Sequence, residues 1–211
     1  MTNRLASLFI GLVLYGVSMA MMVRAGLGLD PWDVFHQGVA DNTGLSFGTV
    51  TALTGVVVLL IWIPLRQRPG FGTVANVVVI AVSVDAALAL IPTVEPLAAR
   101  IAVMLAAVVT NAFATALYIG AGMGPGPRDG LMTGFVARTG GSIRLVRTAI
   151  EITVLAIGWA LGGSVGVGTV VYALGIGPLV HLFSAVMPGS HRNARTTEPA
   201  TETVEPGATA A

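Results

Sequence analysis

The chain has 211 residues, of which 55% are hydrophobic and only 10% are charged, and its mean hydropathy is +0.85. Soluble proteins carry about 25% charged residues, so this composition indicates a membrane protein. The sequence holds no cysteine and three scattered histidines, which excludes disulfides, thiol nucleophiles and cysteine-ligated metal sites. A net charge of +1 predicts no binding to nucleic acid. We expect no cofactor and no bound metal ion.

Six apolar stretches are each long enough to cross a bilayer, which takes a helix of about 20 residues. In chain order they are 5–23, 46–65, 72–92, 98–119, 142–161 and 167–187. A segment exposed to lipid must satisfy its own backbone hydrogen bonds, and the alternating pattern of barrel strands is absent. The sequence therefore predicts an all-α, polytopic membrane protein with about six transmembrane helices.

The sequence repeats itself after 96 residues, without a gap. The matching pairs include Gly26/Gly122, Gly28/Gly124, Pro31/Pro127, Asp33/Asp129 and Gly38/Gly134. We therefore divide the chain into two homologous membrane units, 1–96 and 97–187. The first stretch has features of a cleaved signal peptide, but it aligns with 101–119 and is expected to be a mature helix. The polar tail, 188–211, is expected to be disordered and cytoplasmic.

The arginines predict the orientation in the membrane. With six spans, nine of the eleven arginines fall on one side, and only Arg24 and Arg100 fall on the other. The positive-inside rule then places both termini in the cytoplasm, with the chain in the bacterial inner (plasma) membrane. Each unit contributes three spans, so the second enters the membrane upside down relative to the first. Such inverted repeats occur in many secondary transporters and channels.

A short extra helix is predicted after the first span of each unit. In the first unit Asp30 is a good N-cap and Pro31 a good first helical residue, and the helix should end at Asn42-Thr43-Gly44. The second copy should run from Pro127 to about Arg138. The backbone residues of this motif are Gly26, Gly28, Pro31, Gly122, Gly124 and Pro127.

Two arrangements fit this motif. In one, each loop dips into the membrane and the short helix returns, so that two helix starts approach the midplane and favour an anionic group or repel cations. In the other, each short helix lies at the membrane interface, with Trp32 as an anchor. Asp33 and Asp129 fit either arrangement.

Ionisable residues inside apolar spans are costly and usually mark a pathway. Asp85, Glu151 and His181 are of this kind, and Asp85 overlays His181 under the 96-residue shift. These two could form a carboxylate–imidazole relay, or each could bond separately to neighbouring groups. Glu151 could serve a pathway or simply pair with Arg147 at i,i+4.

Two further polar candidates, Asn76 and Tyr172, overlay each other near the start of the third span of each unit, and they are second-rank candidates for a central site.

The motifs resemble a known family. The run Ala25-Gly-Leu-Gly-Leu-Asp-Pro-Trp-Asp33, the stretch Thr43–Val50, the stretch Pro69–Thr73 and Asp85 resemble bacterial YczE/YyaS/YitT-type integral membrane proteins, in the YczE-like branch. The resemblance covers about residues 1–187 and implies a polytopic plasma-membrane protein of unassigned activity. The second copy departs from the first where Arg128 stands in place of Trp32.

Three functions are compatible with these features. The inverted repeat and buried ionisable residues favour a small-solute transporter or channel-like permease, with the lipid bilayer and a small solute as its partners and a homodimer as a plausible assembly. The alternative is a non-catalytic membrane partner or regulatory subunit. An intramembrane enzyme is disfavoured because no nucleophile stands at a useful spacing from Asp85 and His181.

Overall fold

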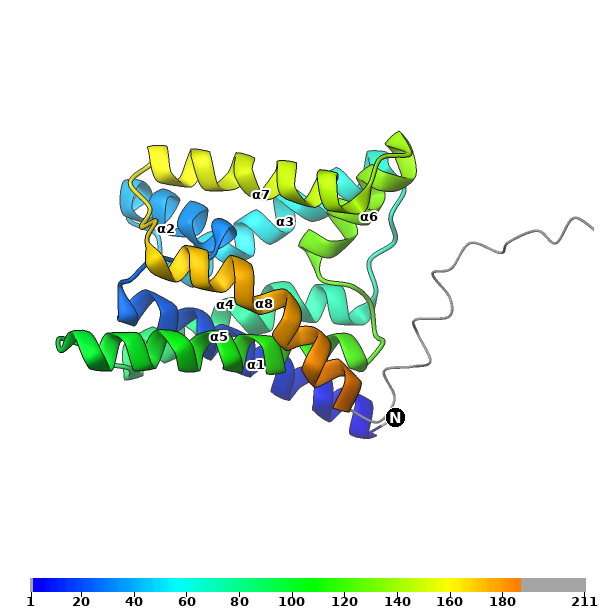
Figure 1. The fold of residues 1–211 in the computed structure, drawn as a ribbon. Coiled ribbons are helices and arrows are strands. Elements are labelled where there is room, and N and C mark those ends of the chain that lie inside the picture. Colours follow the sequence, from blue (N-terminus) through cyan, green and yellow to red (C-terminus); the bar gives the residue numbers. More distant parts are fainter. Residues whose placement is uncertain (1, 187–211) are drawn as a thin grey trace, which may run out of the picture.

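The computed structural model describes residues 2–186 and, over this range, consists of eight helices without a strand (Figure 1). The helices are α1 (Thr2–Ala25), α2 (Pro31–Thr43), α3 (Phe47–Leu65), α4 (Phe71–Leu90), α5 (Leu97–Gly120), α6 (Pro127–Thr139), α7 (Ile143–Ala160) and α8 (Val167–Val186). The predicted all-α fold class is confirmed. The tail predicted to be disordered, 188–211, lies outside the described residues.

Among the described helices, five are long and apolar enough to cross a membrane: α1, α3, α4, α5 and α8. The sixth predicted span, α7, does not meet this criterion because Arg144, Arg147 and Glu151 lie within its 18 residues. In Figure 1, α7 nevertheless extends over much of the same width of the molecule as α1 and α5. The protein is thus a polytopic all-α membrane protein, with five spans supported by length and composition instead of six.

The first short helix has the predicted ends. Pro31 begins α2, and Asp30 is its N-cap: Asp30 Oδ1 accepts hydrogen bonds from the backbone N–H groups of Trp32 (2.9 Å) and Asp33 (3.1 Å). The helix ends before Gly44, which has a left-handed φ of 72°. A proline at the first position, a carboxylate cap and a terminal glycine are the usual signals for a helix of this length.

The second copy of the motif folds in the same way. Pro127 begins α6, and the helix ends before Gly140 at φ 67°. The turns that lead into both short helices use glycine in a conformation that other residues rarely adopt, since φ is 110° at Gly28 and 120° at Gly124. Space requires glycine as well, because a Cβ atom at Gly28 would lie 2.5 Å from the backbone nitrogen of Gly166.

Helix α2 begins inside the protein and ends at its surface. Trp32 and Asp33, in its first turn, are 6% and 1% exposed, whereas residues 41–45 at its end are exposed. A helix lying flat at the membrane interface would not bury its first turn in this way. Protein therefore covers Trp32, and this side chain does not serve as an anchor in lipid.

The two halves of the chain make reciprocal contacts through their long helices. Near the start of α1, Arg4 donates from Nε to the carbonyl of Ala121 at the end of α5 (2.8 Å). Near the start of α5, Arg100 donates from Nε to the carbonyl of Ala25 at the end of α1 (2.7 Å). The two helices therefore lie antiparallel, and each arginine satisfies a free carbonyl at the end of the other helix.

The short helices are exchanged between the halves. α2 packs mainly on α7, and α6 packs mainly on α3, so each short helix rests on a long helix of the other half. Close approach requires glycine at both contacts: a Cβ atom at Gly158 would lie 2.4 Å from the Phe35 nitrogen, and one at Gly130 would lie 2.0 Å from Trp62 Cζ2. This exchange brings the beginnings of α2 and α6 toward one another.

Candidate functional site

A cavity of about 430 Å³ lies where the two short helices begin, and all eight helices contribute to its wall. Such a volume suits a small organic ligand. Several of the candidates from the sequence line it: Asp129, His181, Glu151, Asn76, Tyr172, Pro31 and Pro127. Asp33 lies behind the wall of the cavity and contacts two lining residues, His36 and Arg128. Gly26, Gly28, Gly122 and Gly124 form the turns that lead into α2 and α6.

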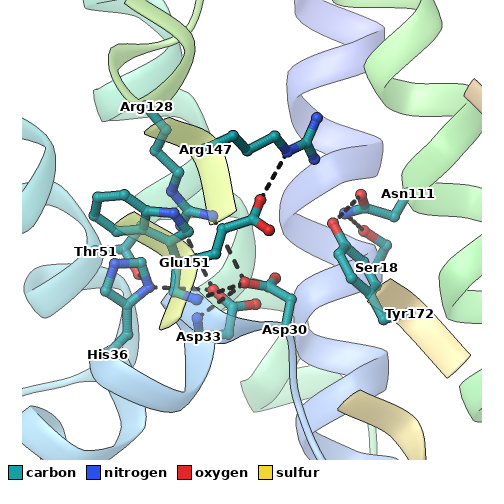
Figure 2. Close-up of polar contacts among 11 residues, drawn as sticks. Ser18, Asp30, Asp33, His36, Thr51, Asn111, Arg128, Arg147, Glu151 and Tyr172 are labelled. Atoms are coloured by element: carbon teal, nitrogen blue, oxygen red, sulfur yellow. Dashed lines mark hydrogen bonds and ion pairs between the residues drawn. The ribbon is translucent and has the colours of Figure 1, made fainter. Parts of the chain in front are cut away.

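Arg128 links the beginnings of the two short helices (Figure 2). It is the second residue of α6, and its guanidinium lies 3.8 Å from Asp30 Oδ1 and 3.6 Å from Asp33 Oδ1 on the α2 side. The guanidinium carbon also lies 5.0 Å from the ring centroid of Trp32, within the range of a cation–π contact. One cation from the second half thus faces two carboxylates and an aromatic ring of the first half.

Asp33 also holds the imidazole of His36, one turn further along α2. The distance between Asp33 Oδ1 and His36 Nδ1 is 3.1 Å, and both side chains are 1% exposed. The Thr51 hydroxyl lies 3.3 Å from the same nitrogen. A carboxylate beside Nδ1 favours the tautomer whose proton is on Nδ1, which leaves Nε2 as an acceptor. Within the described residues, Nε2 has no hydrogen-bond partner.

Asp129, the counterpart of Asp33, has different surroundings. Its Oδ2 accepts a hydrogen bond from the Tyr118 hydroxyl (3.1 Å). The beginning of α6 is fixed by Trp62, whose Nε1 donates to the carbonyl of Pro127 (3.0 Å). Asp129 therefore faces the cavity with a neutral partner instead of a paired cation.

A second polar group borders the cavity at Tyr172. Its hydroxyl donates to Asn111 Oδ1 (2.9 Å), and Asn111 Nδ2 donates to the Ser18 hydroxyl oxygen (2.8 Å). Figure 2 shows this chain of three side chains apart from the cluster around Arg128. Asn76, the counterpart of Tyr172, lines the cavity as well. Both second-rank candidates therefore lie at one site.

Arg147 and Glu151 form the local ion pair that their spacing allows. Arg147 Nε donates to Glu151 Oε1 at 2.9 Å, and the side chains are 54% and 31% exposed. Both residues also line the cavity. The two interpretations of Glu151, an ion pair with Arg147 and a place on a solute pathway, are therefore compatible, since a paired guanidinium and carboxylate can still face a ligand.

Asp85 and His181 are not brought together, so the first of the two alternatives, the carboxylate–imidazole relay, is wrong. Asp85 lies at the end of α4, where its carboxylate accepts hydrogen bonds from the Ser46 hydroxyl (2.5 Å) and from the backbone N–H of Gly48 (2.7 Å). It therefore caps α3 and ties α3 to α4. His181 lies on α8 and lines the cavity, to which Asp85 does not contribute.

A family model described as "Family of unknown function (DUF6198)" matches residues 2–185. The chain belongs to this family. It is 39% identical over 176 residues to an uncharacterized protein of Haemophilus influenzae, covering 83% of this chain and 81% of the other. It is 33% identical over 169 residues to the uncharacterized membrane protein YczE of Bacillus subtilis, covering 79% and 78%. No solved structure matches.

These relatives confirm the resemblance to YczE but assign no activity to the DUF6198 fold, so the chemistry of the cavity must be read from its residues. Sequence reasoning missed several of them as site residues, among them Asp30, His36 and Arg128. A signal for Arg128 was present, because it is an arginine in the first turn of a short helix whose counterpart carries Trp32. The position of His36 one turn after Asp33 was a comparable signal.

Proposed function

We propose that this protein is a small-solute carrier that exposes its central cavity to one side of the membrane at a time. The observation that carries the proposal is a difference between the two ends of the cavity. At one end Asp85 ties α4 to the beginning of α3. At the equivalent end the corresponding residues, His181 and Ser142, make no such tie within the described residues.

The packing of the helices agrees with this difference. α3 packs along α4, whereas α7 and α8 scarcely approach one another over their described lengths. In Figure 1 the last turns of α8 diverge from the beginning of α7. Both helices line the cavity, through residues such as Glu151 and His181. We infer that the cavity is closed between α3 and α4 and accessible between α7 and α8.

A hinge is available in α8. Pro178 lies inside this helix and removes one backbone hydrogen bond, and Gly175 and Gly177 lie beside it. The equivalent residues of α4 are Val79, Ala81 and Val82, which favour a regular helix. Movement of the last turns of α8 toward α7 would close the cavity, and release of Asp85 would open the other end.

The reciprocal contacts between the halves support an inverted repeat, in which the two units exchange conformations during transport. With α7 as a sixth span, the distribution of arginines predicts that the α7–α8 end faces the cytoplasm. The state described here is then open to the cytoplasm.

The test uses the absence of cysteine from the chain. A single reporter cysteine at Thr54, which lines the cavity, is labelled with a membrane-impermeant maleimide in right-side-out and in inverted vesicles. We expect labelling only in inverted vesicles. Asp85→Ala should permit labelling from outside, and His181→Asp, which supplies the missing carboxylate, should reduce labelling from the cytoplasmic side. Equal labelling from both sides in the unmodified background would indicate a pore and would overturn the proposal.

The solute itself can be found independently. Metabolite uptake by deletion and overexpression strains should differ for one class of compound, and Asp85→Ala should abolish that difference.

A further inference from the structure

The charges around the cavity do not balance. Carboxyl groups outnumber guanidinium groups by two among the titratable side chains at or directly behind its wall: Asp30, Asp33, Asp129, Glu151, Arg128 and Arg147. Arg128 is shared by two carboxylates, Arg147 pairs with one, and Asp129 has the Tyr118 hydroxyl. The N-terminal ends of α2 and α6 offset part of this excess, each with about half a positive charge. A bound cation would neutralise the remainder while the carboxyl groups stay ionised.

Two buried polar atoms of residues that line the cavity also lack a hydrogen-bond partner within the described residues. They are Nε1 of Trp32 and Nε2 of His36, which belong to cavity-lining side chains that are 6% and 1% exposed. The indole N–H can only donate. The imidazole Nε2 is left to accept, because Asp33 holds Nδ1. An unpaired polar group inside a protein is destabilising, and a ligand that accepts one hydrogen bond and donates another would provide both atoms with a partner.

We propose that the cavity binds a small organic ammonium compound that also carries a hydrogen-bond-accepting oxygen. This inference rests on the proposed carrier function and names the class of its solute. The ammonium group would donate to Asp129 and to His36 Nε2, and the oxygen would accept from Trp32 Nε1–H. The excess of carboxylate charge would be reduced by one.

The aromatic residues of the wall fit the same ligand. Tyr15, Tyr118 and Tyr172 line the cavity, and ring faces attract cations. The contact of Arg128 with Trp32 is a cation–π contact already present at this wall.

An anionic solute is disfavoured because both guanidinium groups already face carboxylates. Adding a negative charge to a site with surplus carboxylates would cost electrostatic energy in a medium of low polarity. A neutral solute would leave the imbalance of charge as it is.

Binding is tested on the purified full chain in detergent at fixed pH and ionic strength, by thermal unfolding and tryptophan fluorescence. The probes are ethanolamine, 3-amino-1-propanol and tyramine. Two compounds of the same shape as tyramine serve as controls: neutral 4-hydroxyphenethyl alcohol and anionic 4-hydroxyphenylacetate. We expect at least one ammonium compound to raise the melting temperature saturably, and neither control to do so.

Variants locate the site. Asp129→Asn should weaken binding of the active amine at least tenfold, and Glu151→Gln offers a second variant if the first fails to fold. Asp41→Asn, at the exposed end of α2, should bind like the unmodified protein. Failure of all three amines, or stabilisation by 4-hydroxyphenylacetate equal to that by tyramine, would overturn the inference.

The two proposals fail separately. One-sided labelling at Thr54 without amine binding would leave a carrier for another solute. Amine binding with equal labelling from both sides would leave an amine site in a protein that is not a carrier.

Discussion

The guanidinium of Arg128 lies over the indole ring of Trp32, 5.0 Å from its centroid, and these two residues occupy equivalent positions, 96 residues apart, in the two halves of the chain. Two residues at equivalent positions of the two halves can contact each other only at the boundary between the halves. The pair therefore marks the centre of the molecule. It also marks a position where the halves differ, since an aromatic ring in one corresponds to a cation in the other.

Arg128→Ala should destabilise the protein. It leaves Asp30 and Asp33 facing each other without a cation, and removing one partner of a buried ion pair costs about 3–5 kcal/mol. Because the Arg128 side chain is 23% exposed, we expect about 2 kcal/mol, measured by thermal unfolding in detergent. Arg128→Lys should be intermediate, since it keeps the charge but loses the planar group. An Arg128→Ala variant that melts like the unmodified protein would show that the two carboxylates are uncharged.

Trp32→Phe should lower the affinity for the amine while changing the stability of the protein little. The substitution removes the unpartnered indole N–H but keeps a ring beneath Arg128. We expect the free energy of unfolding to stay within about 1 kcal/mol of the original, because loss of ring volume is offset by removal of an unpaired donor. Affinity for the active amine should fall about fivefold, the equivalent of one neutral hydrogen bond. Unchanged affinity would argue against a ligand oxygen at Nε1.

Arg4→Ala and Arg100→Ala should have similar effects. Each removes two hydrogen bonds from a guanidinium to carbonyl groups at the end of the opposite long helix. We expect each to cost about 2 kcal/mol, measured by thermal unfolding, whereas Arg68→Ala, at an exposed position, should have little effect. A large effect of only one of the pair would mean that the reciprocal contacts are not equivalent in solution.

Gly28→Ala and Gly124→Ala should abolish stable folding. Both positions have a positive φ, and the added methyl group would lie 2.5 Å from the Gly166 nitrogen in one case and 2.8 Å from Thr73 Oγ1 in the other. Gly44→Ala provides the control, because φ is also positive there but no atom lies within 4 Å of the added carbon. It should cost only about 1 kcal/mol. Yields of folded protein after detergent extraction compare the three, and equal yields would contradict the close contacts.

The short helices could be predicted from sequence because their signals are local. Asp30, Pro31 and Gly44 lie within 15 residues of each other and fix the beginning and end of α2. The 96-residue shift likewise predicts which helices correspond, since α2 maps onto α6 residue for residue.

The pairing across the cavity could not be predicted in this way. Asp85 and His181 are equivalent in sequence, but equivalent residues meet only near the centre of the molecule, and Asp85 lies at the end of α4 beside Ser46. Nothing in a single sequence reports the distance of a residue from that centre. The contact of Arg128 with Asp30 joins residues 98 positions apart, and it depends on the exchange of the short helices.

The exchange of α2 and α6 has a consequence for biosynthesis. When the ribosome has completed α4, α2 still lacks α7, the surface on which it packs. Until α6 and α7 have been synthesised, Asp30 and Asp33 have no contact with Arg128, and the incomplete chain is surrounded by lipid or by the insertion machinery. Final assembly is therefore a late event, and the first 96 residues expressed alone should be degraded unless the remainder is supplied as a separate chain.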